Sequence, residues 1–158
     1  MEARGKSFSI VILIFFIIFL LWAVFQFISP FSIPENSVKD LSGIIGVIDN
    51  QEITSDMSFP WSSVYGCGDS LCHQRDDRSF FINGNQMPFC SRCTAIWLGL
   101  AIGLGFMVFF KIELNSKLLI LIFIGLIPIS VDGLGQLFGL WDSSNIARLI
   151  TGLLIGIV

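Results

Sequence analysis

The chain has 158 residues, of which 54% are hydrophobic and only 13% are charged, and its mean hydropathy is +0.82. This composition excludes an ordinary soluble domain and indicates an integral membrane protein with a few spans and one modest extramembrane loop. The net charge of -3, without any basic run, gives no support for a nucleic-acid partner, so the partner that composition indicates is the lipid bilayer.

The first predicted element is a transmembrane helix at Phe8–Ile28, an apolar run of about 20 residues that can cross a hydrocarbon core of about 30 Å. Arg4 and Lys6 precede it, as basic residues precede the apolar part of a signal peptide. The apolar run is too long for a signal peptide, and Ser29-Pro30 offers no small-residue cleavage site. We therefore expect residues 1–30 to form an uncleaved signal anchor.

Residues 31–91 form a predicted loop outside the membrane. Its first part is rich in prolines and acids, and the short apolar stretch Gly43–Ile48 predicts either a strand or a segment lying on the membrane interface. The composition changes from Phe59 onward. All four cysteines and the single histidine of the chain follow in one short window: Cys67, Cys72, His73, Cys90 and Cys93.

Residues 92–158 form a predicted membrane bundle. Two further spans are expected at Thr94–Phe110 and Lys117–Phe138. A fourth apolar segment, Ile146–Val158, has about 13 residues and would be roughly 20 Å long as a helix, which is short for a full crossing. The predicted fold class is thus an all-α membrane protein with three to four transmembrane helices and a Cys/His-containing loop between the first and second.

Basic residues near the spans predict the orientation, because Lys and Arg gather on the cytoplasmic side. Arg4 and Lys6 precede the first span, and Lys111 and Lys117 lie in the short link between the second and third. We expect a multi-pass protein of the cell membrane with its N-terminus and this link in the cytoplasm. The cysteine loop would then be extracytoplasmic.

The cysteine spacing is compatible with several kinds of site. Cys90 and Cys93 form a C-x-x-C pair, and Cys67 with Cys72 forms a wider pair upstream, a spacing that overlaps four-cysteine zinc sites. His73 is next to Cys72, and adjacent side chains rarely reach one metal, so the ligands would be four cysteines or three groups chosen around Cys72 and His73. An open fourth position would make such a site catalytic.

Other chemistries fit the same window. An even number of cysteines outside the cytoplasm is often a disulfide framework. A C-x-x-C at the membrane surface beside a second pair would also suit a thiol oxidoreductase that passes electrons to a quinone. A stretched haem attachment at Cys67 to His73 is a further alternative, although its spacing is irregular.

A second polar group lies inside the predicted membrane bundle. Asp132 and Gln136 are four residues apart and share one helix face, and Arg148 lies in the first turns of the last apolar segment. At 1.5 Å per residue, Asp132 and Arg148 fall at about the same depth. An ionised group in lipid costs several kcal/mol, so we expect the two to pair or to face a polar cavity.

Glycine patterns in the bundle would let its helices approach closely. Gly99-x3-Gly103 and Gly152-x3-Gly156 are patterns of this kind, and they would serve packing. Such approaches would bring the cysteine loop over the Asp132, Gln136 and Arg148 group at the outer leaflet, and residues gathered in this way are typical of a site.

Several motifs together resemble one known group of proteins, the small prokaryotic membrane proteins of domain-of-unknown-function family 2085. They are CHQ (72–74), RSFFINGNQMPFCSRC (78–93), DGLGQLFG (132–139) and SSNIARLITG (143–152). The family's pattern falls on Cys72, His73, Cys90, Arg92, Cys93, Asp132, Gln136, Asn145 and Arg148, and Cys67 is outside it. The resemblance implies a core set of Cys72, His73, Cys90 and Cys93, which favours a metal, zinc in the first place, over two disulfides. It implies no activity.

Three functions follow as hypotheses. In a membrane-embedded metal-dependent hydrolase or transferase, the metal would polarise a water or carbonyl, Asp132 would move protons and Arg148 would hold an anionic group. In a quinone-linked thiol-disulfide oxidoreductase, Cys90 and Cys93 would react with the quinone while Cys67 and Cys72 carry electrons outward. In a non-enzymatic structural or accessory subunit, the metal would only hold the loop on the bundle.

Overall fold

The computed structural model describes residues 2–110, 112 and 115–158, with side chains from residue 9 onward. The predicted orientation rests partly on Arg4 and Lys6, whose side chains are outside this description, and on Lys111, which is outside the described residues. The chain divides into two units. The loop unit is Val24–Thr94, and the membrane unit comprises the chain up to Ala23 together with Ala95–Val158.

The membrane unit is built from helices α1 (Glu2–Ser32, up to Ala23), α4 (Ser91–Phe109, from Ala95), α5 (Ser116–Leu137) and α6 (Asn145–Ile157). Within the described residues, three helices are long and apolar enough to cross a membrane. Large apolar side chains along them are exposed, such as Ile14 (51%) on α1 and Phe123 (69%) on α5, as expected of surfaces that face lipid. The predicted all-α membrane fold is therefore confirmed.

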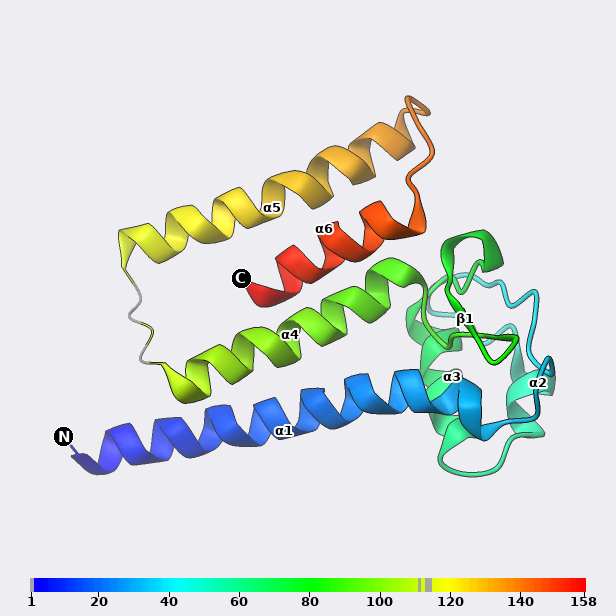
Figure 1. The fold of residues 1–158 in the computed structure, drawn as a ribbon, viewed down its shortest axis with the longest axis horizontal. Coiled ribbons are helices and arrows are strands. Elements are labelled where there is room, and N and C mark those ends of the chain that lie inside the picture. Colours follow the sequence, from blue (N-terminus) through cyan, green and yellow to red (C-terminus); the bar gives the residue numbers. More distant parts are fainter. Residues whose placement is uncertain (1, 111, 113–114) are drawn as a thin grey trace. The chain divides into compact units, whose positions relative to one another are not determined.

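Helix α6 is shorter than the other three, as its sequence predicts. It has 13 residues, against 22 in α5. In Figure 1, α4, α5 and α6 run side by side within the membrane unit.

The side chains of Asn115 and Ser144 cap α5 and α6 by accepting hydrogen bonds from Leu118 N and Ala147 N.

Glycines permit a close approach between α4 and α6. A Cβ on Gly156 would lie 2.5 Å from Ile96 O and 2.8 Å from Gly99 Cα, and a Cβ on Gly103 would lie 2.6 Å from Ile157 O. These are contacts with backbone, which cannot move aside as a side chain can. The predicted packing role of Gly99, Gly103 and Gly156 is thus confirmed.

Replacing Gly156 with alanine should therefore separate α4 from α6. We expect a loss of about 1–3 kcal/mol, typical of overpacking, measured as a lower unfolding temperature of the full chain in detergent by tryptophan fluorescence. Gly133→Ala in α5 is the matched control, because a Cβ at Gly133 meets nothing within 4 Å. Equal stability of the two variants would contradict the close approach.

The loop unit is an irregular fold with short elements. They are α2 (Gln51–Ser55), α3 (Trp61–Leu71), a 3-10 turn η1 (Asp76–Arg78) and the antiparallel pair β1 (Phe81–Ile82) and β2 (Asn85–Gln86). The two strands are joined by Asn83 and Gly84, whose φ angles of 53° and 69° are those of the tight hairpin turn that Asn-Gly favours. Figure 1 shows α2, α3 and the hairpin gathered together.

A small apolar core and a set of buried amides hold the loop unit together. The core is Ile33, Val38, Leu41 and Tyr65. Asn85 Oδ1 accepts from Val38 N at 3.0 Å, while Gln86 Oε1 accepts from Leu41 N at 2.9 Å. Both side-chain amides are fully buried. They therefore supply the hydrogen bonds that water would otherwise make to the backbone of the long segment that follows α1.

The apolar stretch Gly43–Ile48 forms no strand, so that part of its prediction is wrong. A turn at residues 45–46 interrupts it, with Gly46 at a φ of 91°, and Gly46 N donates to Ser70 O. Asp49 Oδ2 also accepts from Ile44 N at 2.8 Å. These bonds take the place of a partner strand. The alternative prediction, a segment on the membrane interface, stays a prediction.

Candidate functional site

Three cysteines from two helix ends of the loop unit come together. Cys72 follows the last turn of α3, Cys90 immediately precedes α4, and Cys93 lies in the first turn of α4. Their sulfur atoms all lie within 4.8 Å of one another. Cys72 and Cys90 are buried, at 1% and 2% exposure, and Cys93 is half-buried.

The backbone near Pro88 explains why the end of α3 meets the start of α4. Gly68 of α3 packs directly against Pro88 O, and any side chain at Gly68 would collide with that carbonyl. Gln74 Nε2 donates to the same Pro88 O at 2.8 Å. Because Pro88 precedes Cys90 by two residues, both contacts hold Cys90 beside Cys72.

Hydrogen bonding within the cluster favours a thiolate at Cys90. Cys90 N donates to Cys72 Sγ at 3.3 Å. Hydrogen bonds from Cys72 and Cys93, with a smaller contribution from His73, hold the pKa of the Cys90 thiol well below its usual range. The bond to Cys90, together with burial, raises the pKa of Cys72 to about 11. These hydrogen bonds therefore favour ionisation of the Cys90 thiol over ionisation of the Cys72 thiol.

The distances within the cluster fit a single tetrahedral metal ion. Zinc binds thiolate sulfur at about 2.3 Å, which places two tetrahedral sulfurs about 3.8 Å apart. Sulfurs within 4.8 Å of one another need only a small contraction to reach that geometry. A divalent cation would also stabilise all three thiolates, removing the cost of ionising neighbouring thiols.

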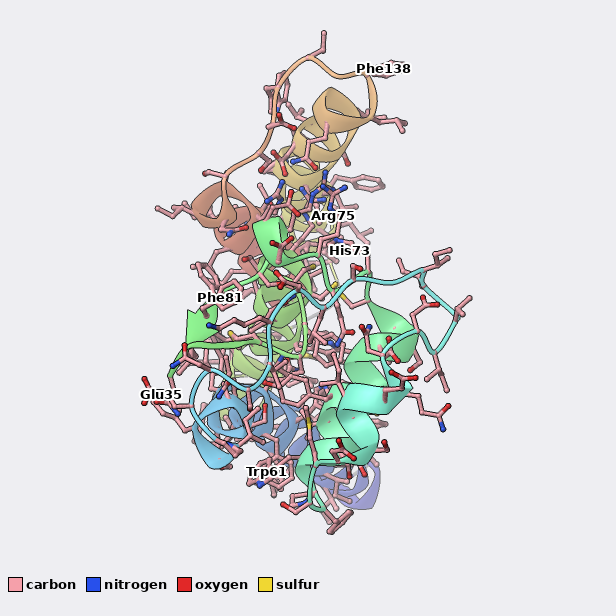
Figure 2. The ribbon with its side chains drawn as sticks, turned by 90° about the vertical axis from the view of Figure 1, so that its right-hand side faces the viewer. Glu35, Trp61, His73, Arg75, Phe81 and Phe138 are labelled. Carbon is pink, nitrogen blue, oxygen red and sulfur yellow. The ribbon has the colours of Figure 1, made fainter. Side chains whose placement is uncertain are left out.

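His73 and Cys67 lie outside the group of three. Among the described residues, no fourth Cys, His, Asp or Glu ligand atom joins the set. His73 Nδ1 accepts a hydrogen bond from Arg75 N at 3.1 Å, and Figure 2 shows the two residues next to each other. Cys67 is a half-buried residue of α3. All four cysteines are free thiols in this structure.

The second predicted group lies in the membrane unit, on α5 and at the start of α6. Asp132 and Arg148 are buried, at 8% and 5% exposure. With its amide oriented by its neighbours, Gln136 Oε1 accepts from Arg148 Nη2 at 3.0 Å and from Ser143 N at 2.9 Å. Arg148 Nη1 also donates to Asn145 Oδ1 at 3.1 Å. The structure thus joins Gln136 to Arg148. The placement of the cysteines over this group stays a prediction.

Sequence reasoning assigned no role to the buried amides next to the cysteine cluster, although both lie within the motifs shared with the family. Gln74 and Gln86 are fully buried, and Gln86 Nε2 donates to Gln74 O. Gln74 Oε1 accepts from Asn50 Nδ2 at 3.1 Å, and Asp69 is buried against the same amide. Amides beside turn residues are common on surfaces, so composition alone gives no sign of burial.

These elements define a polytopic membrane protein with a cysteine-bearing unit between its first and second spans. The family of predicted membrane proteins DUF2085 matches residues 72–158, which include the three clustered cysteines, His73, Asp132, Gln136 and Arg148 but exclude Cys67. The match spans more than half of the chain, and the protein belongs to this family. The resemblance seen in the sequence motifs is thus confirmed.

Two archaeal relatives are similar to this chain. One is an uncharacterized protein of Methanocaldococcus jannaschii, 39% identical over 97 residues, which are 59% of this chain and 61% of the relative. The other is an uncharacterized protein of Methanothermobacter thermautotrophicus, 34% identical over 87 residues, which are 55% of this chain and 78% of the relative. No solved structure matches the chain significantly.

Proposed function

We propose that this protein carries one zinc ion on the sulfurs of Cys72, Cys90 and Cys93 and acts as a membrane-embedded metal-dependent hydrolase or transferase. The observation that carries the proposal is the convergence of three sulfurs within 4.8 Å, from helix ends far apart in sequence. The family match begins at Cys72, so the cluster lies within the part of the chain shared with the family and Cys67 does not.

An odd number of clustered sulfurs favours a metal over a disulfide framework. Two disulfides would need Cys67 to pair with one member of the cluster, yet Cys67 lies outside the group. Three thiols can form only one disulfide among themselves, which leaves one thiol unpaired. A tetrahedral metal ion can bind all three sulfurs. We place this unit on the extracytoplasmic side, following the basic residues that flank the spans.

The chemistry that zinc supplies when bound is polarisation of a water or carbonyl oxygen. The polar residues of the membrane unit have separate proposed roles. Asp132 moves a proton, and Arg148 holds an anionic group of a lipid or exported substrate. Gln136 orients the Arg148 guanidinium through the 3.0 Å bond to Nη2.

One observation favours a second candidate, a quinone-linked thiol-disulfide oxidoreductase. Cys90 and Cys93 form a C-x-x-C at the start of α4, and the pKa of Cys90 is lowered, as in redox-active pairs at helix N-termini. Cys90 is only 2% exposed, which restricts attack on a substrate disulfide. Reversible oxidation of Cys90 and Cys93 by a quinone, with no metal present, would favour this candidate.

Metal removal tests the proposal. Treating the purified full chain with a strong chelator should release about one zinc, free the three clustered thiols for labelling, and lower the unfolding temperature of the protein. Zinc binding contributes folding free energy where it joins segments of a small unit, and the loop unit has only a small apolar core. Re-adding zinc should restore the original value. Unchanged thiol labelling and stability after chelation would overturn the proposal.

A further inference from the structure

The loop unit contains a pocket that is separate from the cysteine cluster. Its volume is about 610 Å³, within the range of pockets that hold small molecules. It is lined by the end of α1, the segment that follows α1, and α2 with the residues just after it, and Figure 1 shows α2 close to the end of α1. All of its lining residues belong to the loop unit, and none of them is a cysteine or a basic residue.

The charges around this pocket favour a cation. Glu52 of α2 and Asp56, which caps the C-terminus of α2, both line it. Among the residues that the structure describes, neither carboxylate forms an ion pair. Like charges four residues apart repel each other, and a cation between them removes that repulsion. Ser32, the last residue of α1, also lines the pocket, and α1 has no basic residue in its last turn, so the negative end of its dipole favours a cation as well.

Two hydroxyl groups of the pocket are arranged as acceptors. Ser32 Oγ donates to Ile28 O at 3.2 Å, and Ser37 Oγ donates to Asn85 Oδ1 at 3.3 Å. A hydroxyl has one hydrogen and two lone pairs, so each Oγ can only accept a further hydrogen bond. The two carboxylates are acceptors too. These four side chains therefore match a ligand with several N–H donors and no acceptor, and an ammonium group has that property.

The remaining lining indicates what the ammonium group is attached to. Ile33 and Val38 belong to the apolar core of the loop unit, and Ile53 and Met57 pack against that core. These side chains favour an aliphatic body behind the charged group. A divalent metal fits this pocket less well, because within the described part of the chain the cysteines form the only group of three or more side chains placed to hold one.

The position of the pocket along α1 indicates the source of the ammonium group. The candidate membrane span of α1, Ser9–Ser32, has 24 residues and is about 36 Å long at 1.5 Å per residue. It therefore extends past a hydrocarbon core of about 30 Å, into the level of the lipid headgroups. Ile28 and Phe31, exposed at 43% and 64%, leave an apolar surface for lipid chains at the same helix end.

We propose that this pocket binds a primary ammonium group on an aliphatic body, and that the group is the headgroup of an aminolipid of the bilayer. The ammonium lies between the carboxylates of Glu52 and Asp56, and the hydroxyls of Ser32 and Ser37 supply further acceptors. The lipid chains extend along the apolar surface of α1. This binding site goes beyond the proposed zinc chemistry and does not depend on it.

Native mass spectrometry of the full chain in a nonionic detergent tests the site, with phosphatidylethanolamine and phosphatidylcholine as probes. Both headgroups carry one positive charge, but only the first has N–H donors. The wild-type chain should bind phosphatidylethanolamine at least about tenfold more tightly, as expected from hydrogen bonds to charged groups. Glu52→Gln with Asp56→Asn should abolish this preference and leave the zinc content unchanged. Both side chains are exposed, so the double variant should keep the unfolding temperature of the lipid-free protein.

Asp76→Asn is the matched control, because Asp76 is an exposed acid of the same unit outside the pocket. It should keep the preference, and an equal loss in this variant would overturn the site in favour of net charge. Equal affinity of the wild-type chain for the two lipids would overturn it as well. Displacement of phosphatidylethanolamine by Ca²⁺ in the wild-type chain would make the pocket a metal site and overturn the proposal. Equally tight binding of soluble n-butylamine would support the ammonium site but overturn the lipid as its source.

Discussion

Replacing Cys90 with serine is expected to weaken zinc binding by at least about 100-fold. Structural zinc sites with four ligands have apparent binding free energies of about 10–16 kcal/mol, or roughly 3 kcal/mol for each ligand, and 1.4 kcal/mol is a factor of ten. Serine keeps the size of the side chain and is a good residue before a helix, so α4 should still begin at Ser91. Competition with a chromophoric zinc chelator measures the affinity of the full chain.

Cys67→Ser is the matched control for this prediction. Cys67 is a half-buried thiol in the same unit, outside the group of three sulfurs and outside the family match. Its replacement should leave the zinc affinity unchanged within about twofold, since it removes no ligand. Equal losses in Cys67→Ser and Cys90→Ser would point to four cysteines acting together and would contradict the assignment of three.

Replacing Arg148 with methionine is expected to destabilise the membrane unit by about 3 kcal/mol. Removing the buried guanidinium leaves buried acceptors without their donor, which typically costs about 1–3 kcal/mol for each acceptor. Here the change deprives Gln136 Oε1 of one of its two donors and Asn145 Oδ1 of its 3.1 Å bond, while Asp132 stays buried. The unfolding temperature in detergent measures the loss, and Lys117→Met, at an exposed position of α5, is the control.

A double variant separates structure from function at this group. If Asp132 and Arg148 serve only to pair the helices, Asp132→Leu with Arg148→Met should recover stability and leave function intact. If Arg148 holds a substrate anion, stability should return while activity or substrate binding stays lost. An Arg148→Met variant as stable as the wild-type chain would contradict the buried network altogether.

The membrane helices could be predicted closely because lipid imposes a simple requirement. A long apolar run without charges has few other stable states in a bilayer, so the predicted span Lys117–Phe138 differs from α5 by one residue at each end. The first helix was predicted less completely, since α1 extends to Ser32 through Pro30. The short length of α6 was predicted from the same rule.

The loop unit could not be predicted in the same way. Helix α3 contains two glycines and three serines, which are poor helix formers, and it is stabilised by tertiary contacts such as the 2.7 Å bond from Tyr65 Oη to Gln86 O. Spacing predicted that cysteines would cluster, but it left open which of them would do so. The family resemblance already placed Cys67 outside the core set, whereas the position of His73 outside the group of three sulfurs depends on how the chain turns after α3.

The most direct test of the central claim is X-ray absorption at the zinc edge, combined with the zinc content of the purified full chain. The three-cysteine site predicts about one zinc per chain, with three sulfur neighbours at about 2.3 Å and one lighter donor atom. A protein without zinc, whose thiols become reactive only after reduction, would contradict the claim. A shell of four sulfurs would contradict the assignment of Cys72, Cys90 and Cys93 as the complete set of sulfur ligands.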